Sequence, residues 1–186
     1  MVASVRSILL QQFNGYLSTG GSNRYYIKDL TWQVKQGEHW VLLGGNGAGK
    51  SALGAALIGE AKQQSGQRHS TFNNLQLVSS DLQKQLLSAN RKSDKPQKVT
   101  DILFSAPEIN RDLCQQLITA LNFDALLNRN FTDLSTGETR KLLLIKALSA
   151  NSDLVVLDEP FDGLDTESTR QLNRLLKQLS THTCFV

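Results

Sequence analysis

A glycine-rich stretch with the spacing G-x-x-x-x-G-K-S runs from Gly44 to Ser51. This is the pattern of a phosphate-binding loop, in which backbone N–H groups point inward and the positive end of a helix lies behind them. The glycines let the main chain close on an anion, the Lys50 ammonium can reach the outer phosphates, and the Ser51 hydroxyl can bind Mg²⁺. A plain glycine turn between a strand and a helix is the alternative interpretation. The predicted nucleotide contacts of the loop are Gly44, Gly45, Asn46, Gly47, Ala48, Gly49, Lys50, Ser51 and Ala52.

Two acids follow an unbroken apolar run later in the chain. Residues 154–157 predict a strand covered on both faces, and Asp158 and Glu159 come directly after it. In a parallel sheet this end of the strand faces the same crevice as a phosphate loop. Asp158 is therefore predicted to hold the Mg²⁺, directly or through a water, and Glu159 to polarise an attacking water. The alternative is that two acids simply end a strand in solvent.

Strands and helices alternate around these residues. The hydrophobic pattern predicts strands over 5–13, 26–34, 41–43, 75–78, 154–157 and 183–186, and helices over 51–61, 82–89, 111–121, 138–150 and from 166 onward. A further short helix over 102–104 is expected after a cap at Thr100 and Asp101. Turns are expected at 14–24 and 63–67, and an exposed basic loop at 90–98. The alternation favours an α/β layer fold with a parallel sheet, interrupted by a mainly helical insertion from about residue 81 to 138.

Composition excludes several classes of protein. A net charge of +3 over 186 residues is too mild to argue for nucleic acid, and the basic loop lacks interleaved aromatic residues. The chain begins with no signal peptide and contains no apolar run of membrane-spanning length, so a membrane role would need a partner. Cys114 and Cys184 form no C-x-x-C motif and are typical of reduced thiols in a cytoplasmic protein.

A third motif gives the chain a resemblance to a known family. The run Leu134-Ser135-Thr136-Gly137-Glu138 is similar to the signature, L-S-G-G-Q or L-S-G-G-E, of the ATP-binding-cassette (ABC) ATPases, and residues 154–165 are similar to their Walker B and D-loop run. The order of the motifs also matches, so the resemblance covers nearly the whole chain. It implies a P-loop NTPase with a RecA-like mixed or parallel sheet core, N-terminal antiparallel strands and a helical ABC subdomain. We expect one nucleotide-binding domain over 1–186, with the core at about 1–80 and 139–186 and the helical subdomain at about 81–138.

The resemblance also implies a mechanism. In the family, the signature completes the ATP site of a facing cassette, so that two cassettes bind two ATP molecules head to tail, with Asp165 of the D-loop at the junction. Such a cassette binds Mg-ATP and hydrolyses it to drive conformational change. Its implied partners are a second cassette, in the same polypeptide or a second copy, and a membrane permease subunit. It would be cytoplasmic or peripheral at the inner membrane face, without direct membrane insertion.

Residues 135–141 and 159–165 further resemble the first cassette of the tandem ABC proteins of the ModF type, which are linked by name to molybdate transport. Two alternatives stay open. One is a nucleotide-binding switch or scaffold that hydrolyses poorly. The other is a soluble ABC factor acting on DNA or ribosomes, for which the basic loop is the only support.

The sequence departs from the family pattern at several positions. Ser80 falls near the place of a usual glutamine, with Gln76 and Gln83 out of register, and Thr136 replaces a signature glycine. Tyr16 is the candidate for stacking on adenine, with Tyr25 and Tyr26 as runners-up. The family's switch histidine would lie a few residues beyond Val186, so we expect a fragment that is C-terminally truncated.

Overall fold

The computed structural model describes residues 5–18, 24–91, 97–105, 108–180 and 183–186. The chain divides into two compact units. The first comprises residues 1–77, 153–158 and 182–186, and the second comprises residues 78–152 and 159–181. The division predicted from the sequence, with a core at 1–80 and 139–186 and a helical subdomain at 81–138, stays a prediction.

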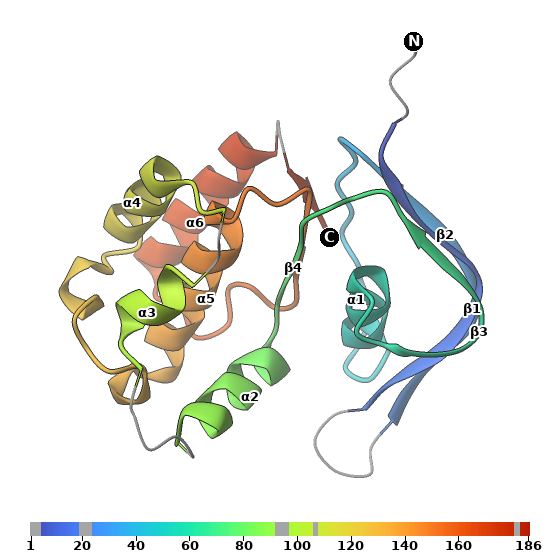
Figure 1. The fold of residues 1–186 in the computed structure, drawn as a ribbon, viewed down its shortest axis with the longest axis horizontal. Helices are drawn as coiled ribbons and strands as arrows, with labels where there is room; N and C mark the ends of the chain where they lie inside the picture. The colour runs from blue at the N-terminus through green and yellow to red at the C-terminus, as the bar shows by residue number, and fades with distance from the viewer. Residues whose placement is uncertain (1–4, 19–23, 92–96, 106–107, 181–182) are drawn as a thin grey trace. The chain divides into compact units, whose positions relative to one another are not determined.

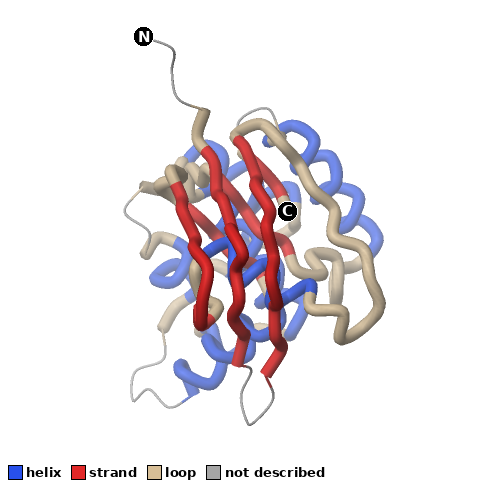
Figure 2. The backbone as a smooth tube through the Cα atoms, turned by 90° about the vertical axis from the view of Figure 1, so that its right-hand side faces the viewer, coloured by secondary structure: helices blue, strands red, loops and turns tan. Residues whose placement is uncertain are grey.

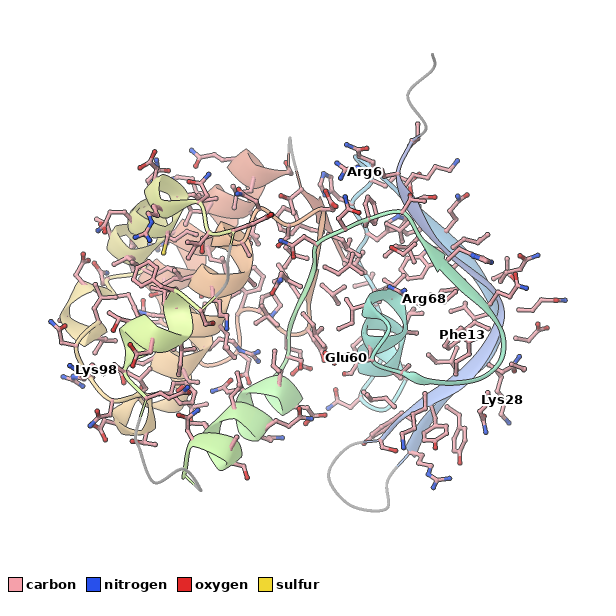
Figure 3. The ribbon with its side chains drawn as sticks, in the orientation of Figure 1. Arg6, Phe13, Lys28, Glu60, Arg68 and Lys98 are labelled. Atoms are coloured by element: carbon pink, nitrogen blue, oxygen red, sulfur yellow. The ribbon has the colours of Figure 1, made fainter. Side chains whose placement is uncertain are left out.

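The first unit contains an antiparallel sheet with the strand order β2-β1-β3, whose three strands face the viewer in Figure 2. Its strands are β1 (Ser7–Ser18), β2 (Arg24–Lys35) and β3 (Lys62–Ser70). One face is apolar because side chains alternate across a strand. Phe13 is buried in a cluster with Ala56 and Leu57, whereas Lys28 lies on the exposed face (Figure 3).

A second sheet in this unit has the order β4-β5-β6 and supplies the predicted parallel pairing. Its strands are β4 (Leu75–Val78), β5 (Leu154–Leu157) and β6 (Cys184–Phe185), and β5 runs parallel to β6. Helix α1 (Lys50–Ile58) packs on β5 at Gly54, where an added Cβ would lie only 2.8 Å from Val156 Cγ1. A glycine is therefore what allows the helix to approach this strand so closely.

Two turns that the sequence predicts in the first unit are wrong. The polar segment 63–67 is not a turn but part of β3, because its backbone pairs with β1 and the Arg68 guanidinium donates to the carbonyls of Ala56 and Leu57 at the end of α1 (Figure 3). Residues 14–18 and 24 likewise belong to strands rather than to the predicted turn, of which residues 19–23 lie outside the described residues.

The expected buried strand at 41–43 is also absent. Val41 is 80% exposed and Leu43 is 89% exposed, and no regular strand is assigned to this stretch. The nearest pairing is a single backbone hydrogen bond, in which Trp40 N donates to Phe185 O at 2.9 Å. Because β6 has only two residues, it offers too short an edge to hold a ladder here.

The second unit is helical. Its helices are α2 (Ser80–Arg91), α3 (Val99–Leu103), α4 (Arg111–Ala120), α5 (Thr136–Ser149) and α6 (Thr166–Leu179), with short 3-10 turns at Asp124–Leu126 and Phe131–Asp133. Helix α5 is buried along most of its length and contacts α2, α3 and α4 (Figure 1). A helix that is apolar on most faces belongs in the middle of a bundle. The predicted α/β class, with antiparallel strands at the start and a helical part, is confirmed.

Two details of this unit differ from the sequence prediction. The helix expected to begin after Thr100 and Asp101 begins at Val99, where the Asp101 carboxylate accepts a hydrogen bond from the backbone N–H of Lys98 at 3.1 Å. The predicted basic loop at 90–98 begins within α2, which extends to Arg91, and residues 92–96 lie outside the described residues. Within the described ranges, no helix is both long and apolar enough to cross a membrane.

Candidate functional site

The glycine-rich loop has the backbone that its sequence predicts. Gly47 and Gly49 adopt φ values of +81° and +90°, in the left-handed region that side chains other than glycine rarely enter. A Cβ built on Gly45, Gly47 or Gly49 would meet no described atom within 4 Å. The loop therefore borders open space, as a cradle for an anion requires.

Helix α1 begins at Lys50, and no side chain of the described residues caps its N-terminus. By contrast, the side chains of Asn110, Ser135 and Asp165 cap α4, α5 and α6. The first N–H groups of a helix have no partner inside the helix, and their positive end attracts anions. The start of α1 is thus left to a ligand, which agrees with a phosphate site.

The Lys50 ammonium lies on its own loop. Its Nζ donates to the carbonyls of Gly44 and Gly45, at 2.9 and 3.1 Å. A pocket of about 340 Å³ adjoins the loop, and Trp32, Trp40 and Lys50 are among the residues that line it. Because the two carbonyls carry only partial charge, an arriving phosphate would compete well for this ammonium.

Asp158 belongs to the same unit as the loop and is half-buried at the end of β5. Gly54, which lies four residues after Lys50, packs closely on Val156, which lies two residues before Asp158. This packing is consistent with a site that the glycine-rich loop and Asp158 share. Carboxylate and hydroxyl oxygens are ligands that Mg²⁺ accepts beside phosphate oxygens, so Ser51 and Asp158 fit this ion. Among the described residues, no group of three or more His, Cys, Asp or Glu side chains could hold a metal ion without phosphate oxygens as further ligands.

Glu159 follows directly and is exposed. Its φ is +52°, in the left-handed region. For a residue with a side chain this conformation costs on the order of 1 kcal/mol, and such residues cluster at functional sites. The strained backbone agrees with the predicted role of Glu159 as the base, which stays a prediction.

In the signature stretch, Ser135 and Glu138 form a reciprocal cap at the start of α5. Glu138 Oε2 accepts from Ser135 N at 2.7 Å, and Ser135 Oγ accepts from Glu138 N at 3.3 Å. The Ser135 hydrogen bonds hold the pKa of the Glu138 carboxyl below its usual value. The stretch as a whole, Leu134 to Glu138, therefore presents the start of a capped helix.

The D-loop lies against this helix within the second unit. A Cβ on Gly137 would lie only 2.5 Å from the Gly163 carbonyl oxygen. Asp165 caps α6 by accepting from Ser168 N at 2.8 Å, and its carboxylate pairs with the Lys141 ammonium at 3.0 Å. The Ser168 hydrogen bonds, aided by Lys141, lower the pKa of Asp165 well below its usual range. Asp165 therefore has a local structural role besides its predicted place at a cassette junction.

Tyr16 lies in β1 with cations over its ring. Arg24 lies 4.9 Å and Lys62 Nζ lies 6.0 Å from the ring centroid, and the ring of Tyr26 lies 5.7 Å away. A base that stacks on Tyr16 would share the ring with these groups. Tyr25 and Tyr26, the runners-up, are 40% and 53% exposed, so each also has ring surface open to a ligand.

Two buried polar residues, Gln83 and Arg140, make contacts that the sequence does not predict. Gln83 Nε2 donates to the Thr136 carbonyl at 2.8 Å, and the guanidinium of Arg140 donates to Ser80 Oγ at 2.8 Å. Local spacing offers no signal for either contact, because Ser80 lies outside the helix predicted at 82–89. Their partners lie more than fifty residues away, where spacing carries no information.

Comparison with known proteins agrees with this arrangement. A family model described as "ABC transporter" matches residues 27–162. The chain is 37% identical over 180 residues to the ABC transporter ATP-binding protein ModF of Escherichia coli (strain K12), covering 91% of this chain and 36% of ModF. It is 31% identical over 160 residues to the zinc import ATP-binding protein ZnuC of Anaplasma phagocytophilum (strain HZ), covering 84% of this chain and 63% of ZnuC.

A solved structure is similar as well. It is the complex of the archaeal ribosomal stalk protein aP1 with the archaeal ribosome recycling factor aABCE1, and a chain of it matches with a TM-score of 0.72 and 21% identity. The match covers 95% of this chain and 32% of that chain. At this identity the likeness shows the fold alone. The chain thus spans about a third of the length of ModF and of this structural neighbour.

Proposed function

Because the chain belongs to the ABC transporter family, whose cassettes are ATPases, we propose that it binds Mg-ATP on the loop from Gly44 to Ser51 and hydrolyses it. The observation that carries the proposal is the open glycine loop in front of an uncapped helix. Within the described part of the chain no side chain caps α1, and the glycines of the loop leave space for phosphate oxygens.

Each chemical group has a role in this proposal. The loop amides and Lys50 hold the phosphates, and Ser51 and Asp158 hold the Mg²⁺, which would neutralise charge on the phosphate oxygens when bound. Glu159 accepts a proton from the attacking water. Carboxylates are among the side chains that serve as general bases in enzymes.

The signature would act on the ATP of a facing cassette. The capped start of α5, from Leu134 to Glu138, would present its first N–H groups to the outer phosphate of that ATP, and Asp165 would lie near the junction. The facing cassette is a second copy or another part of a longer polypeptide, and a permease is the natural recipient of the motion. We place the protein in the cytoplasm or at the inner face of the membrane; its relation to molybdate stays a prediction.

Phosphate release tests the chemistry. Replacing Glu159 by Gln keeps the shape of the side chain but removes the base, so ATP turnover should fall by about a hundredfold or more. Glu60→Gln is the matched control, because Glu60 is exposed at the end of α1 and takes no part in the proposed site. If Glu159→Gln turns over ATP as fast as the parent and the control, Glu159 is not the base.

A second candidate function is a nucleotide-binding switch that hydrolyses slowly. The contact between Ser80 and Arg140 favours it, because this hydroxyl is engaged inside the second unit. The two candidates differ in rate. Turnover well above one per minute by the paired cassettes would exclude the switch, whereas ATP-driven pairing without turnover would support it.

A further inference from the structure

The first turn of α5 is tied to the first turn of α2 by side chains from both helices. Gln83 lies on α2 and is 5% exposed, and its amide donates to the carbonyl of Thr136, the first residue of α5. Arg140, one turn further along α5, is 2% exposed and donates to the Ser80 hydroxyl on α2. Two polar contacts, each with one buried side chain, therefore join the same pair of helix ends.

The donor helix is itself well fixed. The Ser79 hydroxyl accepts from the backbone N–H of Leu82 at 3.1 Å and so caps α2, while Gln83 N donates to the Ser79 carbonyl at 3.1 Å. Gln83 thus extends from a rigid turn. A buried amide hydrogen bond of this kind specifies position, because leaving either group unsatisfied is costly.

The hydrogen bond from Gln83 is accepted by the signature stretch, which in the proposed function faces the ATP of a second cassette. Thr136 replaces a glycine of the family pattern, and its neighbour Gly137 approaches the Gly163 carbonyl closely. The turn 136–137 therefore has two close contacts, one with the Gly163 carbonyl and one with the Gln83 amide. Small displacements of such a turn would change how its N–H groups meet a phosphate, because hydrogen bonds weaken steeply with misalignment.

We propose that Gln83 is a positioning residue. Through its hydrogen bond to the Thr136 carbonyl, it sets the position of the turn 136–137, here called the signature turn, and the Ser80–Arg140 contact helps to hold that position. The proposal rests on the proposed function for its consequence, which is ATP-driven pairing. Gln83 acts through Thr136, and no contact of Gln83 with nucleotide is required.

The experiment compares Gln83→Leu with Gln85→Leu in the full 186-residue chain. Leucine keeps most of the volume but removes the amide donor, and Gln85 is an exposed residue of the same helix. The first measurement is amide hydrogen exchange at Thr139 and Arg140 without nucleotide. Exchange there should become about tenfold faster in Gln83→Leu, whereas Gln85→Leu should leave it unchanged, since a lost hydrogen bond of about 1.4 kcal/mol is worth a factor of ten.

The second measurement is ATP-driven pairing by sedimentation in a Glu159→Gln background, with the ATP-induced rise in melting temperature as a measure of binding to the chain's own loop. Gln83→Leu should raise the protein concentration needed for half-pairing about tenfold and leave the rise unchanged. Ser80→Ala should weaken pairing in the same direction, and Ser80→Thr, which keeps the hydroxyl, should restore it.

The outcomes separate this proposal from the proposed function. Unchanged hydrogen exchange in Gln83→Leu overturns the positioning role whether or not the chain pairs. Faster exchange with no ATP-driven pairing in the parent leaves the positioning of the turn intact and counts against the head-to-tail mechanism. Equal pairing of Gln83→Leu and Gln85→Leu, in a chain that does pair, shows that the turn needs no such support.

Discussion

The Lys50 ammonium donates to two carbonyls of its own loop. Its contribution to folding can therefore be measured without ligand, apart from its contribution to ligand binding. Lys50→Met keeps the aliphatic stem and removes the ammonium from a half-buried position. We expect little change in the melting temperature without ligand, because hydrogen bonds between an ammonium and carbonyls at a wet site contribute about 1 kcal/mol or less.

With ATP the same variant should differ sharply from the parent. Ligand at about 100 times its dissociation constant stabilises the folded state by about 2.7 kcal/mol, which raises the melting temperature of a chain of this size by roughly 5 to 10 °C. Lys50→Met should lose most of this rise, and Lys177→Met, an exposed lysine of α6, should keep it. Thermal melting with and without Mg-ATP measures both. A full rise in Lys50→Met would remove the ammonium from the site.

Single residues differed in how far the sequence could predict them. The spacing of Gly47, Gly49 and Lys50 predicted a left-handed loop and the start of a helix, because both depend on neighbours in the chain. Gln83 and Arg140 could not be predicted, because their partners are set by how α2 meets α5. Gln83 is out of register with the glutamine of the family pattern, and that pattern carries no information on its contact with Thr136.

At the scale of elements, the contact between α5 and the D-loop predicts the effect of a single methyl group. Gly137→Ala would bring a Cβ to 2.5 Å from the Gly163 carbonyl oxygen, and Gly163 itself adopts a φ of +74°. Overpacking of this kind costs about 1 to 3 kcal/mol, and the better helix propensity of alanine returns up to about 1 kcal/mol. We expect a net loss of about 1 kcal/mol in the free energy of unfolding.

Urea denaturation would measure that loss. Gly45→Ala is the matched control, because no described atom lies within 4 Å of its Cβ position and its φ is not left-handed. It should change the free energy of unfolding by less than about 0.5 kcal/mol. A stable Gly137→Ala would mean that the D-loop moves aside freely, and so that the signature and the D-loop are not fixed to each other.

The elements themselves divide by what stabilises them. The strands 75–78 and 154–157 and the helix at 111–121 follow from local hydrophobic patterns, and the structure confirms them within a residue. Strand β3 could not be predicted, because its polar residues pair with β1 at long range. The stretch 41–43 has the pattern of a buried strand but lacks a partner edge among the described residues, so its apolar side chains face outward.

At the scale of the whole molecule, that exposed stretch predicts a second kind of association, independent of ATP. Val41 is 80% exposed beside Leu43 at 89%, and apolar backbone edges of this kind tend to pair with other chains. We expect the parent chain to self-associate without nucleotide. Val41→Lys should weaken that association about tenfold, because burying one valine is worth about 1.5 kcal/mol and lysine also protects an edge.

Val5→Lys is the control, because Val5 is a valine that is also well exposed, at 62%, and lies outside the sheets. Sedimentation at several concentrations, each with and without Mg-ATP, separates the two kinds of association. Val41→Lys should lower the nucleotide-independent part and leave the ATP-driven part, which depends on the signature turn. If Val41→Lys and Val5→Lys associate alike without ATP, the exposed stretch does not drive contact between chains, and any pairing that remains must come from elsewhere on the surface.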